Sequence, residues 1–107
     1  MKYPFDKHFL VCTGERCNNE KNGDERGEEI RAVLKDLNKS LGRKRNVRIC
    51  AVSCLDLCDH GPNMIVEPEG TVYSHLDRAK GIAIYHGEMG DGPAHPEFEL
   101  DEAELKR

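Results

Sequence analysis

Two pairs of cysteines constrain this chain more than any other feature of its sequence. Cys12 and Cys17 are separated by four residues, Cys54 and Cys58 by three, and thirty-six residues lie between the pairs, giving the pattern C-x4-C-x36-C-x3-C. The first pair begins at the end of the apolar run 7–12, and the second follows the alternating run 47–52. Both runs are typical of β-strands. The fold therefore has two strand ends that each carry a pair of thiols.

The segment between the two runs predicts an amphipathic helix. Its apolar residues fall at offsets of three and four, and Gly42 follows as a C-terminal cap: Ile30, Val33, Leu34, Leu37 and Leu41. A strand, helix and strand in this order join the two strands in parallel, with a right-handed crossover. Parallel strands end at the same edge of a sheet, so we expect the four sulfur atoms to converge at one end of the domain.

Three further elements follow the second cysteine pair. The runs 63–67 and 71–75 flank a tight turn at 68–70, which predicts a β-hairpin. A second helix is expected from Asp77 to His86, closed by Gly87, although Gly81 inside it disfavours a helix. The order β-α-β-β-β-α is that of a thioredoxin-like α/β fold with a mixed sheet and helices packed on it. We expect this domain to span residues 1–87.

Charge and composition exclude several classes of function. Net charge is −4, and no basic stripe suggests nucleic-acid binding. Residues 88–107 hold seven acidic and two basic residues, so we expect an acidic tail that is mobile or draped over the surface. The N-terminus lacks the apolar core of a signal peptide, and no run reaches the roughly 18 apolar residues of a membrane span. We therefore expect a cytoplasmic protein with no membrane partner.

Thiols in the cytoplasm are kept reduced, and an odd count of five cysteines also disfavours a disulfide framework. Metal binding or redox chemistry is the better interpretation. Zinc and single-iron sites usually use C-x2-C pairs, and [4Fe-4S] ferredoxins use a C-x2-C-x2-C run; neither occurs here. The longer spacings favour a two-iron cluster. On spacing alone, a zinc site or free thiols remain alternatives.

Three stretches resemble the thioredoxin-like [2Fe-2S] ferredoxin family, which is related to the small cluster-bearing subunit of NADH dehydrogenase. They are VCTGERC, VSCLDLCDHGP with its trailing Pro62, and IVEPEGTVYSHL, and the resemblance spans residues 7 to about 87. It implies that a [2Fe-2S] cluster is bound by four ligands, Cys12, Cys17, Cys54 and Cys58. It also implies an electron carrier rather than an enzyme, with redox partner proteins, and a homodimer. The acidic tail matches no motif of this family.

Several other residues in or near the cysteine loops are candidates for supporting roles. Cys50 is spaced for a fifth ligand, but its position inside the strand predicts a buried small hydrophobe. His60 is a candidate for coupling reduction to protonation, with a surface turn residue as the alternative, and we expect the other histidines to be solvated or structural. Arg16 and the loop amides are candidate donors to the thiolates. Residues 55–57 and Met64 are candidates for the rim of a docking patch.

The sequence thus favours a small iron-sulfur electron-transfer protein. Two alternatives remain: a zinc-stabilised interaction module whose acidic tail binds a partner, and an accessory electron-transfer subunit of a larger oxidoreductase. The sequence contains no Ser-His-Asp set, P-loop or dinucleotide-binding glycine turn that would indicate other catalysis.

Overall fold

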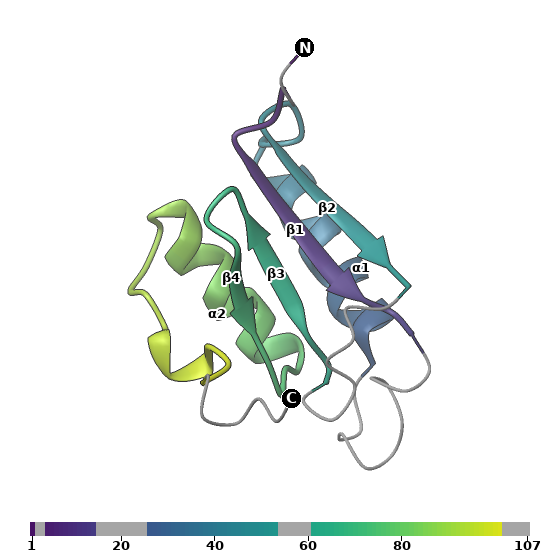
Figure 1. Ribbon diagram of the computed structural model, residues 1–107. Coiled ribbons are helices and arrows are strands. Elements are labelled where there is room, and N and C mark those ends of the chain that lie inside the picture. Colours follow the sequence, from purple (N-terminus) through teal and green to yellow (C-terminus); the bar gives the residue numbers. More distant parts are fainter. Residues whose placement is uncertain (2–3, 15–25, 54–60, 102–107) are drawn as a thin grey trace.

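The computed structural model describes residues 1, 4–14, 26–53 and 61–101 of the chain. In this part the elements form a four-stranded sheet with both α-helices behind it, as Figure 1 shows. The strands are β1 (Lys7–Cys12), β2 (Val47–Val52), β3 (Met64–Glu67) and β4 (Thr71–Tyr73), and the helices are α1 (Gly27–Ser40), α2 (Arg78–Met89) and the short 3-10 helix η3 (Pro96–Phe98). The order along the chain confirms the predicted β-α-β-β-β-α arrangement.

The unit β1-α1-β2 has the predicted parallel crossover. The two strands pair in register over their whole length, from Lys7 opposite Val47 to Cys12 opposite Val52. After α1 the backbone of Gly42 is left-handed, with φ of 69°, a conformation that glycine adopts without steric cost. Because the strands are equal in length and in register, they end together at one edge of the sheet.

The hairpin β3-β4 completes the sheet. β3 pairs with β1 and with β4, both in the antiparallel sense, so the strand order is β2-β1-β3-β4. The turn between them ends at Gly70, whose φ is 77°. The predicted hairpin is confirmed, and β2 and β4 are the edge strands of the sheet.

The core lies between the sheet and the two helices. Alternate residues of each strand point into it, and its fully buried members include Phe9, Val11, Ile30, Leu34, Val66 and Tyr85. Gly81 lies where α2 crosses α1: a Cβ built there would be 3.0 Å from Ile30 Cγ2. The glycine that weakened the sequence-based helix prediction thus permits close packing of the helices.

The predicted end of α2 was wrong. The helix passes through Gly87 and continues to Met89, and Gly90 follows it with φ of 78°. Gly87 has a packing role instead, because a Cβ there would lie 2.7 Å from the carbonyl oxygen of Pro93. The chain after the helix folds back over this glycine.

Residues 90–101 return along the edge of the sheet. The Ser74 amide donates to the Phe98 carbonyl (3.1 Å), and the Leu100 amide donates to the Val72 carbonyl (2.9 Å). This part of the acidic tail is therefore held against β4, while residues 102–107 lie outside the described part of the chain. Across the part of the chain that the structure describes, neither helix has the length and apolar character needed to cross a bilayer.

Candidate metal centre

Cys12 lies at the end of β1, at the edge where the two parallel strands stop. Its side chain is fully buried. Its amide donates to the carbonyl of Asn63 at 3.0 Å, and its register partner is Val52. The first predicted ligand is therefore fixed by the sheet on both sides.

The two loops that carry the cysteine pairs touch directly after the strands. The Thr13 amide and hydroxyl both donate to the Val52 carbonyl, at 2.8 and 3.2 Å. One residue further, a Cβ built on Gly14 would lie 2.2 Å from the Ser53 carbonyl oxygen and 3.9 Å from Cys12 Sγ. No side chain fits between the loops here, so glycine is required at this position for the observed approach.

The second cysteine loop also returns to the same place. Residues 61–63 are buried, and the Gly61–Pro62 peptide is cis. Asn63 accepts the hydrogen bond from Cys12, and the Pro62 carbonyl accepts one from the Leu76 amide at 3.1 Å. The two described ends of this loop therefore lie at the same place, with Ser53 beside Gly14 and Asn63 beside Cys12.

Three of the four predicted ligands, Cys17, Cys54 and Cys58, lie outside the described residues, as do Arg16, His60 and 55–57. Of the two cysteines that the structure describes, Cys12 is buried and Cys50 is partly exposed. Within 1, 4–14, 26–53 and 61–101 there is no group of three or more Cys, His, Asp or Glu side chains able to hold a metal ion. The described part therefore supplies one predicted ligand and the strand ends that carry the others.

The environment of Cys12 fits a thiolate ligand to a metal. A buried thiolate is costly without a compensating positive charge, and thiolates are the preferred ligands of iron-sulfur clusters and zinc. The amides of Cys12 and Thr13 already donate to main-chain carbonyls. Both of these amides are therefore already paired within the main chain.

Two expectations about neighbouring residues were wrong. Met64 is fully buried in the core, because its place in β3 opposite Val11 directs it toward the helices, so it does not rim a docking patch. Cys50 is partly exposed rather than buried, because β2 is an edge strand and the cysteine lies on the face without helices. There its sulfur is 3.1 Å from Nε2 of His8, a pair that residue spacing alone did not reveal.

No family model and no curated protein matches this sequence. Among solved structures, the chain is similar to the wild-type thioredoxin-like [2Fe-2S] ferredoxin from Aquifex aeolicus, with 18% identity and a TM-score of 0.74 over 94% of this chain and 100% of that one. A second structure of a thioredoxin-like [2Fe-2S] ferredoxin from Aquifex aeolicus gives 18% identity and a TM-score of 0.75, over 92% and 93% of the two chains. A cysteine-to-serine variant of the thioredoxin-like [2Fe-2S] ferredoxin from Aquifex aeolicus gives 16% identity and a TM-score of 0.75, over 90% of this chain and 99% of that one.

The chain has the thioredoxin-like fold. The likeness covers nearly the whole of both chains, so it includes the sheet, both helices and the edge where β1 and β2 end. This structural similarity confirms the predicted thioredoxin-like fold class. At this level of identity it defines the architecture around Cys12, whereas the group bound there has to be argued from the residues.

Proposed function

We propose that this protein is an electron carrier with one [2Fe-2S] cluster held by Cys12, Cys17, Cys54 and Cys58. The observation that carries this proposal is the contact between the two cysteine loops, where Gly14 meets Ser53 beside the buried sulfur of Cys12. The sequence around that contact has the C-x4-C and C-x3-C spacing expected from the resemblance. The similar solved structures are thioredoxin-like [2Fe-2S] ferredoxins.

Covalent geometry supports the convergence of the ligands. Cys54 is the residue after Ser53, and Cys17 is the third residue after Gly14, so their Cα atoms lie within about 4 Å and about 11 Å of the touching residues. Cys58 is three residues before Gly61 and is limited to about 11 Å from it in the same way. The length of chain between these residues thus allows the four cysteines to meet at one edge of the sheet, which supports the proposed ligand set.

A bound [2Fe-2S] cluster supplies one-electron redox chemistry. The chain's own role is to fix the ligands and to control access to them. The paired ends of β1 and β2 and the main-chain hydrogen bonds beside them hold Cys12 and Val52 in place, and burial of Cys12 keeps water from its sulfur. We propose that partner proteins dock at this edge and that a reducing compartment such as the cytoplasm keeps the thiols available for the iron.

Single cysteine-to-serine variants of the full chain test the ligand set. We expect Cys12→Ser and Cys54→Ser to lose the visible absorption of the anaerobically purified protein or to shift it strongly, because serine replaces a sulfur ligand. Cys50→Ser is the matched control: it changes the same residue type on β2, four positions from Cys54. It should keep the native spectrum and iron content.

The alternatives give different results. Zinc in place of iron and sulfide, with no visible absorption, would contradict the electron carrier and support a zinc-stabilised module. Loss of the spectrum in Cys50→Ser with retention in Cys54→Ser would contradict the ligand set. Co-purification of a flavin-containing or molybdenum-containing protein would indicate an accessory subunit of a larger oxidoreductase.

A further inference from the structure

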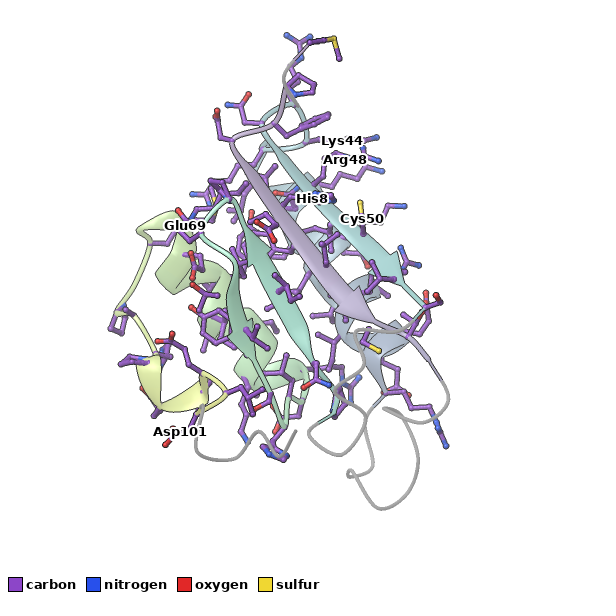
Figure 2. All side chains as sticks on the ribbon, in the orientation of Figure 1. His8, Lys44, Arg48, Cys50, Glu69 and Asp101 are labelled. Atoms are coloured by element: carbon purple, nitrogen blue, oxygen red, sulfur yellow. The ribbon has the colours of Figure 1, made fainter. Side chains whose placement is uncertain are left out.

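A histidine and a cysteine form a close pair on the face of the sheet opposite the helices. His8 Nε2 lies 3.1 Å from Cys50 Sγ. The side chains come from the adjacent parallel strands β1 and β2, where Cys50 is the register partner of Leu10, and Figure 2 shows them side by side there. Cys50 is partly exposed, so the pair lies at the surface of the sheet.

This pair is separate from the candidate metal centre. His8 is four residues before Cys12, and Cys50 is four residues before Cys54. Cys50 also precedes Val52, the residue at the end of β2 that pairs with Cys12. Neither member of the pair is needed for a site of four cysteines, so the proposed cluster does not explain their contact.

Charged groups of both signs surround the pair. Arg48 precedes Cys50 by two residues on β2 and is the register partner of His8. Arg31 on α1 is within electrostatic range of Cys50. On the acidic side, Glu67 on β3 is opposite His8 in the sheet, and Asp6 lines a hollow together with His8 and Glu67.

A second hollow, beside β2, has a mainly basic lining. Its charged lining holds one acidic residue, Asp36, and four basic residues, Lys35, Lys39, Lys44 and Arg48; Figure 2 labels Lys44 and Arg48 near this end of β2. An anionic molecule is therefore attracted to this hollow, one of whose lining residues, Arg48, is two positions before Cys50 on β2.

We propose that Cys50 and His8 form a thiol-modification site that accepts small anionic disulfides such as glutathione disulfide. In the step, the Cys50 thiol transfers its proton to His8 Nε2 while its sulfur attacks one sulfur of the disulfide. A bond forms between Cys50 and that sulfur, the original disulfide bond breaks, and the second glutathione leaves as a thiolate that takes up the proton. The Cys50 sulfur is oxidised and the departing sulfur is reduced.

The protonation state of His8 suits the role of base. Burial lowers the pKa of His8 below its usual 6.5, with the positive charge of Arg48 acting in the same direction and Glu67 opposing both. A neutral ring at physiological pH can accept the thiol proton, whereas a protonated ring has no free lone pair for it. His8 is thus a positioning and proton-accepting residue for the reaction of Cys50.

The test exposes the full cluster-containing protein to glutathione disulfide and follows the adduct by intact mass and peptide mapping. We expect one fast adduct on the peptide containing Cys50 and none at that position in Cys50→Ser. His8→Gln keeps a polar side chain of similar size without a proton-accepting ring nitrogen and should slow the reaction at neutral pH at least about tenfold. His86→Gln is the control, because His86 lies on α2 bonded to Asp91, and its rate should be native.

The pH profile separates this chemistry from simple accessibility. In the native chain the rate should stay high toward neutral pH, whereas in His8→Gln it should climb steeply with pH, as for an unassisted thiol. Equal rates and equal pH profiles in the native and His8→Gln proteins would overturn the proposal, as would a fast adduct confined to other cysteines. Because the readout is an adduct mapped to Cys50, the result does not depend on whether the metal centre is a [2Fe-2S] cluster.

Discussion

Gly14 offers a direct perturbation of the contact between the cysteine loops. A Cβ at this position would lie 2.2 Å from the Ser53 carbonyl oxygen, whereas ordinary contact begins at 3.4 Å, so Gly14→Ala leaves a shortfall of 1.2 Å. The obstructing atom belongs to the main chain at the end of β2 and cannot rotate away. The loops must separate by most of that distance.

The expected cost combines two effects of opposite sign. Overpacking of this kind typically costs about 1–3 kcal/mol, while replacing glycine by alanine stabilises by about 0.4–1 kcal/mol through the unfolded chain. We expect a net loss of about 1–2 kcal/mol in the free energy of unfolding. Metal-ligand distances tolerate deviations of only about 0.2 Å, so the loss of bound iron should be larger than the loss of stability suggests.

Urea unfolding and iron content, measured on the same preparations, provide the assay. Gly92→Ala is the control, because a Cβ there meets only His86 Cβ, at 3.7 Å, and its unfolding free energy should be within about 0.5 kcal/mol of native. If Gly14→Ala retains the stability and the iron content of Gly92→Ala, the two loops do not meet as the structure has them, and the reasoning fails.

Three further predictions concern the scaffold and the His8 site. Gly81→Leu should lower the free energy of unfolding in urea by about 2–3 kcal/mol, because a Cβ alone would already lie 3.0 Å from Ile30 Cγ2; an unchanged urea midpoint would contradict the close helix packing. Tyr85→Phe should cost about 1–2 kcal/mol in the same measurement, because it removes the 2.8 Å hydrogen bond to buried Asn38 Oδ1, and a native midpoint would show that this bond contributes nothing. The pKa of His8 in the folded chain is below 6.5, so the unfolded chain binds more protons at this residue. The contribution of His8 to the free energy of unfolding is therefore complete above about pH 6.5 and is lost as the pH falls through the folded-state pKa. An NMR titration of the His8 ring should give that lower pKa, and a value above 6.5 would reverse the sign of this pH dependence.

The strand-helix-strand unit could be predicted from sequence because local pattern and long-range geometry agree there. The apolar run ending at Cys12 and the helical spacing before Gly42 each specify one element, and parallel pairing then fixes where the strands end. The end of α2 could not be predicted in this way. Gly87 is a residue type that commonly caps helices, but here it lies inside the helix and permits close contact with Pro93, where the chain folds back.

The side chains on the face of the sheet without helices show a second limit of prediction from sequence. The proximity of His8 and Cys50 follows from the parallel register of β1 and β2 together with the edge position of β2. Registers and strand order depend on the whole sheet, so neither residue shows this pairing through its neighbours in the chain. Met64 was misassigned for the same reason, since the face on which it lies is fixed by pairing with Val11.

Iron and acid-labile sulfide per chain, determined on anaerobically purified full-length protein, test the central claim most directly. We predict about two irons and two sulfides per chain, with an EPR signal of one unpaired electron appearing on reduction by dithionite. A folded preparation with zinc, or with neither iron nor sulfide after reconstitution, would contradict the assignment of the four cysteines to a [2Fe-2S] cluster.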